Sequence, residues 1–362
     1  MASIHTELCD LLGIKYPILQ GGMGPYKTED LAIAVSNAGA LGVISSIGMA
    51  ATLLPDAAPV DAVRLFGTDP PKVILQKSIE RVAKETKKTH GIFGVNVPVA
   101  TEFSIASQMF VEQTIETRES DSDIERRLRV IVTSAGNPKP WAEVKKHGLI
   151  WIHVVPSVYH ARKAEAAGAD MIVASGHEGG AHVSWEPVHS MVLVPAVVRA
   201  VKIPVVAAGG ICDGASIAAA LCMGAKGVQM GTRFIATKES DFEPMWKETI
   251  VKLEERQTLT GRGLFGPMRF LRNKRAEMIV EQTLADVPRF YLGEPVESNE
   301  KILQLERSGF DDLLDKKSDT ALMFGGECTG RIDDIPTAKE LIERLVREAA
   351  EVLEKTRASC VR

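Results

Sequence analysis

Two histidines and a glutamate stand in a glycine-rich segment near the middle of this 362-residue chain. Residues 171–185 read MIVASGHEGGAHVSW, which predicts a short buried strand that stops at a loop holding His177, Glu178 and His182. A neutral imidazole on such a loop can act as a general acid or base near pH 7. His182 is therefore the candidate catalytic residue, and the alternative is a loop histidine that makes a structural hydrogen bond.

The same segment does not read as a metal site. A His-Glu-x-x-His zinc signature places both rings on one face of a helix. Here one residue too many separates His177 from His182, and on a helix the two rings would point roughly 140° apart. The two glycines between them also argue against a helix. We expect no metal. His177 and Glu178 could line the pocket or brace the loop, and bracing is favoured for Glu178.

Two further glycine-rich turns favour a phosphate site. Residues 208–214 read AGGICDG and residues 229–234 read QMGTRF, each directly after a short apolar run. Glycine lets the backbone approach an anion closely, and backbone N–H groups at such turns bind phosphate. The alternative is a pair of tight turns without a ligand. Arg233 could neutralise the charge or pair with Asp213. The candidate phosphate ligands are Gly209, Gly210, Gly231 and Thr232.

Two amide side chains stand at the ends of predicted strands. Gln20 ends the run at residues 16–20, and Asn96 ends the run IFGVN at residues 92–96. An amide offers both a donor and an acceptor, which matches the edge of a flavin ring. The alternative for both residues is simple capping of the strand.

The elements that carry these residues alternate regularly. Strands predicted near residues 16, 41, 92, 130, 150, 171, 204 and 227 are separated by amphipathic helices. Eight such units predict an α/β fold, a (β/α)8 TIM barrel, whose active site lies at the carboxyl ends of its strands. We assign residues 1–239 to the barrel, residues 240–318 to a helical accessory (lid) region inserted after strand 8, and residues 319–362 to a glycine-rich loop and a C-terminal helix that returns to the barrel.

Composition narrows the functional class. Apolar residues make up 45% and charged residues 25%, and the formal net charge of −4 gives no general attraction to nucleic acid or anionic membranes. No apolar run is long enough to span a bilayer, and the first residues do not resemble a signal peptide. Five cysteines without a C-x-x-C pair argue against an iron–sulfur cluster. We expect a cytoplasmic protein with reduced thiols.

Together these segments resemble one family, the nitronate monooxygenases (formerly 2-nitropropane dioxygenases), a group that includes the FMN-dependent enoyl-acyl-carrier-protein reductases. The resemblance covers nearly the whole chain. It rests on the order and spacing of short segments such as PILQGGMG at 17–24, FGVN at 93–96, TSAGNP at 133–138, GHEGGAH at 176–182, IPVVAAGGI at 203–211 and QMGTRFIATKES at 229–240.

The resemblance implies an FMN flavoprotein and assigns roles to individual residues. His182 matches the active-site histidine of the family, and the FMN phosphate would lie on the four ligands named above. The flavin ring would lie near Gly22, Met23, Asn96, Ser134, Gly176 and Gly180. The substrate pocket would include His177, Tyr26 and Gly326. The flavin itself carries the hydride and electron chemistry.

The chain departs from the family pattern beside the substrate pocket. Ala181 stands where the family usually has glycine, Ser184 follows shortly after, and residues 24–26 read Gly-Pro-Tyr where the reductases often carry an aromatic pair. These changes leave the FMN assignment intact and leave the substrate open.

The main hypothesis is an FMN-dependent oxidoreductase that takes electrons from NADH or NADPH and reduces an activated alkene such as an enoyl thioester. The alternative is nitronate oxidation with molecular oxygen. A flavin-free aldolase or epimerase is disfavoured because no lysine ends a predicted strand. A non-catalytic flavin binder is a further alternative.

The basic residues 262–275 could bind an acyl carrier protein or coenzyme A, or could be a solvated helix face. A homodimer is expected by analogy with the family.

Overall fold

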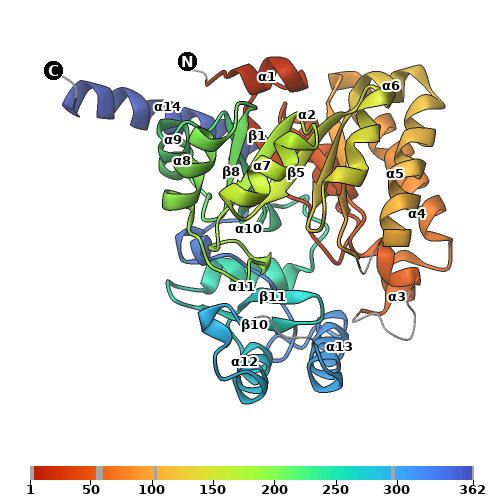
Figure 1. Ribbon diagram of the computed structural model, residues 1–362, viewed down its shortest axis with the longest axis vertical. Coiled ribbons are helices and arrows are strands. Elements are labelled where there is room, and N and C mark those ends of the chain that lie inside the picture. The colour runs from red at the N-terminus through yellow and green to blue at the C-terminus, as the bar shows by residue number, and fades with distance from the viewer. Residues whose placement is uncertain (1–3, 54–59, 102–103, 295–297, 361–362) are drawn as a thin grey trace.

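Eight parallel strands form the central sheet of the protein in a computed structural model that describes residues 4–53, 60–101, 104–294 and 298–360 (Figure 1). The strands follow one another in the order β1-β9-β8-β6-β5-β4-β3-β2, so the sheet curls into a nearly closed barrel. The barrel strands are β1 (Ile18–Gln20), β2 (Gly42–Ser45), β3 (Phe93–Pro98), β4 (Leu128–Ser134), β5 (Ile150–Val155), β6 (Met171–Ser175), β8 (Val205–Ala208) and β9 (Gly227–Met230).

Helices surround this barrel, as the predicted alternation requires. Pro71 begins α4 at the position where proline is preset for a helix, and Asp213 with Ser216 forms a capping box at the start of α9. The α-helices around the barrel are α2 (Glu29–Asn37), α3 (Ala62–Phe66), α4 (Pro71–Glu85), α5 (Ser104–Glu119), α6 (Ser122–Arg127), α7 (Val158–Ala166), α8 (Ser190–Ala200), α9 (Gly214–Cys222) and α10 (Thr232–Ile235). Short 3-10 helices are η1 (Met49–Leu53), η2 (Lys87–Thr89), η4 (Lys139–His147), η5 (Phe290–Leu292) and η6 (Glu327–Arg331).

The inside of the barrel is an apolar core of its own. Alternate residues of the strands, including Val43, Val132 and Val173, pack together there, separately from the layer between strands and helices. Helix α1 (Glu7–Leu12) adds Leu8 and Leu12 to this same cluster. The segment before the first strand therefore closes the amino-terminal end of the barrel.

The barrel seam lies between β1 and β2. Among the residues that the structure describes, one isolated bridge closes this seam, between Leu19 of β1 and Leu41, which directly precedes β2. The side chain of Gln20 adds two hydrogen bonds, because its Nε2 donates to Val43 O at 2.8 Å and its Oε1 accepts from Val43 N at 3.1 Å. Gln20 was expected to point at the rim. Its amide instead completes the sheet at the seam, because it offers the same donor and acceptor as a peptide group.

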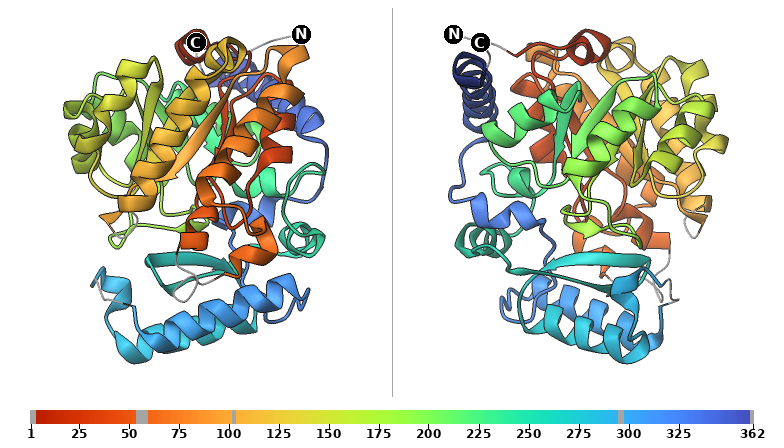
Figure 2. Two further views of the ribbon diagram at one scale, coloured as in Figure 1. Left: turned by 90° about the vertical axis from the view of Figure 1, so that its right-hand side faces the viewer. Right: turned by 60° about the vertical axis from the view of Figure 1, so that its left-hand side comes forward.

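The accessory region contains a β-hairpin as well as helices (Figure 2). The hairpin strands β10 (Thr258–Gly263) and β11 (Gly266–Leu271) form a three-stranded sheet with β7 (Ala181–His182), which comes from the loop after β6. The helices of this region are α11 (Pro244–Lys252), α12 (Lys274–Asp286) and α13 (Glu300–Leu314). The sequence predicted only the helices, because glycines at 261, 263 and 266 interrupt the alternation of the hairpin.

The chain ends in the long helix α14 (Ala338–Cys360), which packs against α9 and α2 on the outside of the barrel. It therefore bridges the first and last units of the barrel, as the predicted return of the C-terminal helix requires. Across the part of the chain that the structure describes, none of the helices has both the length and the apolar character that a membrane span needs.

Candidate active site

A ring of polar side chains lines the carboxyl end of the barrel interior. Side chains alternate along a strand, so the residues two positions beyond the buried Val43, Val132 and Val173 also face inward. These are Ser45, Ser134 and Ser175, and the same alternation directs Asn96 and Gln229 inward. The interior is apolar below this ring. The sequence prediction named Asn96 and Ser134 and missed the other three, although each is the last or next-to-last residue of its strand.

Asn96 is buried and only partly satisfied. Its Nδ2 donates to Val132 O at 3.2 Å, whereas its Oδ1 has no hydrogen-bond partner. A Cβ at Gly22 would lie 2.1 Å from Asn96 Oδ1, so only glycine fits opposite this amide. A buried acceptor without a partner is costly unless a ligand supplies a donor.

The loop after β8 forms a backbone cradle. Gly209 and Gly210 have φ values of +90° and +76°, which glycine adopts easily. A Cβ at Gly209 would lie 2.7 Å from Gly176 O, so the loops after β8 and β6 are in close contact. Among the described residues, no protein group accepts a hydrogen bond from the amides of Gly209 and Gly210. These amides are therefore available to bind an anion, and the phosphate at this loop stays a prediction.

The loop after β9 joins the same cluster. A Cβ at Gly231 would lie 3.5 Å from Met23 Sδ, which brings the loops after β1 and β9 together. Thr232 Oγ1 accepts from Gly326 N at 2.9 Å, and its own hydroxyl proton can still be donated. Arg233 does not pair with Asp213; it forms an ion pair with Asp334 at 3.1 Å.

Gly180 and Gly326 lie against each other. A Cβ on Gly180 would lie 2.8 Å from Gly326 N, and a Cβ on Gly326 would lie 2.6 Å from Glu178 O. The segment at 325–330 thus packs directly on the loop that carries the candidate catalytic histidine. The two glycines are almost 150 positions apart in the sequence, so the sequence alone did not indicate this contact.

His182 lies on β7, where it pairs with Met268 of β11. His182 is exposed to solvent, although many protein atoms lie around its ring. Burial lowers the pKa of His182 from 6.5 to about 4, and the nearby charge of Arg262 acts in the same direction. His182 is consequently a neutral imidazole at pH 7, with one ring nitrogen protonated and the other free.

Glu178 and His177 lie on the loop that leads to His182 and make different contacts. Glu178 accepts hydrogen bonds from Ser190 N at 2.9 Å and from Ser190 Oγ at 3.1 Å, which matches the expected bracing of the loop. Ser190 Oγ also lies 2.9 Å from Gly209 O, so this brace reaches the backbone cradle. The His177 ring packs edge-on against His189, and its Nδ1 has no hydrogen-bond partner.

Tyr26 is buried in an aromatic layer. Its ring packs against Phe242 with centroids 5.0 Å apart, within the aromatic layer that also includes Trp246. The Tyr26 hydroxyl is buried without a partner, and burial raises the pKa of this phenol. Tyr26 therefore packs within this aromatic layer, and its role in the substrate pocket stays a prediction.

The basic segment 262–275 is only partly exposed. It spans the hairpin and the start of α12, and its residues Arg262, Arg269 and Arg275 are all buried. Arg262 stacks over Trp185, with Cζ 5.2 Å from the ring centroid. Arg272 and Lys274 are exposed, so the binding of an acyl carrier protein or coenzyme A by this segment stays a prediction that the three buried arginines do not support.

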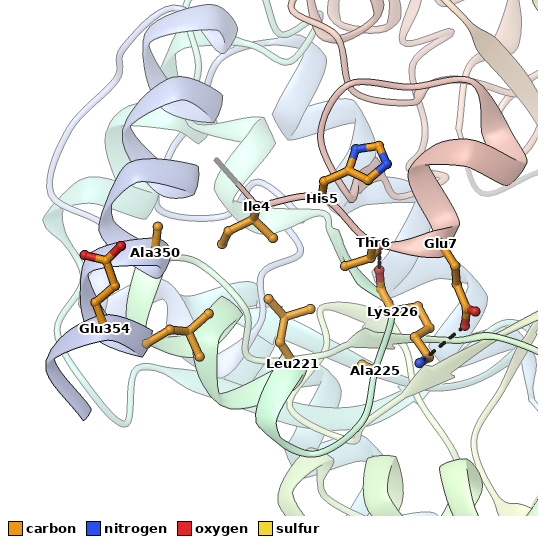
Figure 3. A pocket seen from close by; sticks show the side chains of 10 residues that line it. Ile4, His5, Thr6, Glu7, Leu221, Ala225, Lys226, Ala350 and Glu354 are labelled. Atoms are coloured by element: carbon orange, nitrogen blue, oxygen red, sulfur yellow. Dashed lines mark hydrogen bonds and ion pairs between the residues drawn. The ribbon is translucent and has the colours of Figure 1, made fainter. Parts of the chain in front are cut away.

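A separate surface pocket lies far from these loops. Its volume is about 590 Å³, and the segment before α1, the end of α9 and α14 line it (Figure 3). It also contains Ala225 and Lys226, which precede β9, so it lies at the amino-terminal end of the barrel.

In the described part of the chain, no group of three or more His, Cys, Asp or Glu side chains could hold a metal.

The residues at the carboxyl end fit an FMN. The backbone cradle can take its phosphate, and the unpartnered Oδ1 of Asn96 can accept a hydrogen bond from the ring edge. Glycines at 22, 176 and 209 leave no room for side chains, so the backbone lines this space. Two independent features of the structure therefore agree with one ligand.

Comparison with known proteins gives a consistent picture. The family model described as nitronate monooxygenase matches residues 5–348. A probable nitronate monooxygenase of Staphylococcus saprophyticus is 31% identical over 75% of this chain and 79% of its own length.

Two further similarities extend over almost the whole chain. A protein of Mycobacterium tuberculosis, named (3aS,4S,5R,7aS)-5-hydroxy-7a-methyl-1-oxo-octahydro-1H-indene-4-carboxyl-CoA dehydrogenase, is 29% identical over 96% of both chains. The solved structure of FabK from Thermotoga maritima is 34% identical, with a TM-score of 0.78 over 98% of this chain and 99% of that chain.

Proposed function

Because this chain belongs to the nitronate monooxygenase family and is a flavin-dependent oxidoreductase, we propose that it uses FMN and NADH or NADPH to reduce an activated alkene such as an enoyl thioester. A relative of similar length is named a carboxyl-CoA dehydrogenase, which supports a thioester substrate. The substrate would be attached to coenzyme A or to an acyl carrier protein. We place the reaction in the cytoplasm, in keeping with five unpaired cysteines.

The observation that carries this proposal is a cradle of unpaired backbone amides at the carboxyl end of the barrel, in contact with the loop that leads to His182. Gly209 and Gly210 would hold the FMN phosphate, and Asn96 Oδ1 would accept from the ring edge. Bound FMN would supply hydride transfer to the β-carbon of the alkene. His182 would donate its single N–H to the thioester carbonyl, which stabilises the negative charge that develops on that oxygen.

The proton for the α-carbon is better supplied by water than by His182. A neutral imidazole that gives up its N–H becomes an anion, and the lowered pKa of His182 disfavours the protonated ring that could donate instead. Within the proposal, His182 therefore orients and polarises the carbonyl. Thr232, Gly180 and Gly326 would form the wall between the phosphate site and this carbonyl.

Nitronate oxidation is the second candidate, favoured by the probable nitronate monooxygenase that is 31% identical. In that reaction the unprotonated nitrogen of His182 would assist as a hydrogen-bond acceptor or base. No nicotinamide would be needed.

An anaerobic visible spectrum separates the candidates. A flavin spectrum that bleaches with NADH or NADPH and returns when crotonyl-CoA is added would support the reductase. A spectrum that bleaches only with an alkyl nitronate would support the monooxygenase. A colourless protein that cannot be reconstituted with FMN would contradict both. Light scattering of the same sample tests the homodimer that we include in the proposal.

A further inference from the structure

The accessory sheet makes a direct backbone connection to the histidine loop. Strand β11 pairs with β7, so that Met268 lies opposite His182 and Arg269 lies opposite Ala181. Val183 N also donates to Pro267 O at 2.9 Å. The backbone position of His182 is thus set by the hairpin, and not by the barrel strand that precedes the loop.

Arg269 connects this strand to the start of the same loop. Its Nη2 donates to His177 O at 3.0 Å and lies 2.9 Å from Glu327 Oε1, and its Nη1 donates to Thr258 Oγ1 at 3.2 Å. The residue is only 6% exposed. One buried guanidinium therefore holds the loop at residue 177 while its own backbone holds the loop at residue 181.

Glu327 reaches the loop independently. Its backbone N donates to Glu178 O at 2.9 Å, and the preceding Gly326 N donates to Thr232 Oγ1. Its side chain is the carboxylate that pairs with Arg269, and it remains partly exposed. The pair thus joins the accessory hairpin, the histidine loop and the segment beside the phosphate cradle.

The loop between these two attachments is under backbone strain. Ala181 has a φ of +58°, a left-handed conformation that costs a residue with a Cβ about 1 kcal/mol or more. Such a conformation persists only where the surroundings hold it. The side chain of Arg269 holds His177 O, its backbone pairs with Ala181 itself, and His182 follows Ala181 directly.

We propose that the ion pair of Arg269 and Glu327 is a clamp that positions His182 for the reaction. Arg269 and Glu327 are thus positioning residues for His182. Their effect on the reaction rate rests on the proposed function, in which His182 takes part. Neither side chain needs to touch the substrate.

Arg275 provides a matched control. It is also buried, and it also contacts one carboxylate, one hydroxyl and one carbonyl: Asp312 at 3.0 Å, Ser308 Oγ at 2.9 Å and Thr320 O at 3.2 Å. All of these partners lie outside the histidine loop. Arg269→Gln and Arg275→Gln therefore remove equivalent contacts, but only the first releases the loop.

The first measurement follows the His182 ring by NMR in protein labelled at histidine, with the signal assigned through His182→Gln. We expect Arg269→Gln to shift or broaden the His182 signal, whereas Arg275→Gln leaves it in place. Glu327→Gln should shift it in the same direction and by less. Equal spectra for Arg269→Gln and the wild-type protein would overturn the clamp. This readout needs no turnover, so it stands even if the proposed reaction is wrong.

The second measurement is the single-turnover rate of flavin reoxidation by crotonyl-CoA. Arg269→Gln should slow it about tenfold to a hundredfold, as expected for a misplaced reacting group, and Arg275→Gln should change it less than about twofold. Adding Arg269→Gln to His182→Gln should cause no further loss. A rate loss that adds fully to that of His182→Gln would contradict positioning. If Arg269→Gln does not fold, Arg269→Lys and Glu327→Gln carry the same test.

Discussion

The barrel rim and the accessory sheet hold the same loop by different means. At the rim, glycines at 176, 180 and 209 bring backbone against backbone, and an added Cβ would meet main-chain atoms within 3 Å. At the accessory sheet, Arg269 holds the loop through its side chain. A site built from backbone depends on the absence of side chains, whereas a site built from side chains depends on particular contacts. The two regions should therefore respond to mutation in different ways.

The largest effect is expected where a side chain enters the rim. Gly209→Ala adds a Cβ 2.7 Å from Gly176 O at a φ of +90°, so the cradle must open and the purified protein should lose its FMN. The measurement is flavin absorbance per protein after gel filtration. Gly168→Ala is the control, because it has a similar φ of +97° but nothing within 4 Å of the new Cβ. Retention of FMN by both variants would mean that the cradle does not bind it.

On the accessory side, His182→Gln should leave FMN bound and slow the chemistry. Glutamine can still donate a hydrogen bond, but from a different position and with a different acidity. We expect turnover with crotonyl-CoA to fall about a hundredfold, within the usual range for a group that assists proton transfer or stabilises charge. Steady-state kinetics and a flavin spectrum check both parts. Unchanged turnover would remove His182 from the reaction.

Acid should destabilise the protein between pH 6.5 and pH 4. Burial lowers the pKa of His153, His177 and His182 to about 4, so the unfolded chain takes up protons first as the pH falls. Their contribution is fully present above pH 6.5 and is lost as the pH falls towards 4. For the well-buried His153, each pH unit in this window should cost roughly 1.4 kcal/mol. Urea unfolding at several pH values should show a smaller slope in His153→Gln.

The seam of the barrel gives a moderate effect. Gln20→Leu removes two hydrogen bonds to Val43 and leaves buried backbone groups with fewer partners. We expect a loss of about 2 kcal/mol in the free energy of unfolding. Gln76→Leu on α4, whose amide contacts only the exposed Glu80, serves as control and should change stability little. Equal stabilities for the two variants would show that the seam does not need the Gln20 amide.

The smallest effect is expected at Ala181. Glycine adopts its φ of +58° without strain, so Ala181→Gly should raise the free energy of unfolding by up to about 1 kcal/mol. Thermal unfolding of the FMN-loaded protein measures the change. A loss of stability would mean that the Ala181 methyl group packs usefully against the core.

The barrel could be predicted from sequence because its signals are local. Each strand is a short apolar run that ends at glycine or a polar residue, and each helix has its own apolar face. The glycines of the cradle were predictable for the same reason, since a turn after a strand is a local feature. His182 was identified as the candidate catalytic residue because two histidines in a glycine-rich loop are unusual.

The rest depended on contacts between distant segments. The pairing of β7 with β11 joins residues almost 90 positions apart, and β7 is too short to produce an alternating pattern. Arg269 reads as part of a basic run, because a sequence does not show which charges are buried. Tyr26 was assigned to the pocket by the resemblance to the family, and its packing against Phe242 could not be predicted because the two residues are more than 200 positions apart. Gln20 was expected at the rim because the sequence does not show that the pairing between the first two strands is incomplete, which lets the Gln20 side chain bond to Val43 there.

The position of α14 has a consequence for synthesis on the ribosome. This last helix packs on both α2 and α9, and β1 pairs with β9, so the first and last units of the barrel meet under the final residues of the chain. Pairing of β1 with β9 needs the chain up to Met230, whereas α14 cannot cover the junction until residues 338–360 have left the exit tunnel. The two ends of the sheet should therefore pair first, and the outer faces of α2 and α9 should stay uncovered until α14 packs on them.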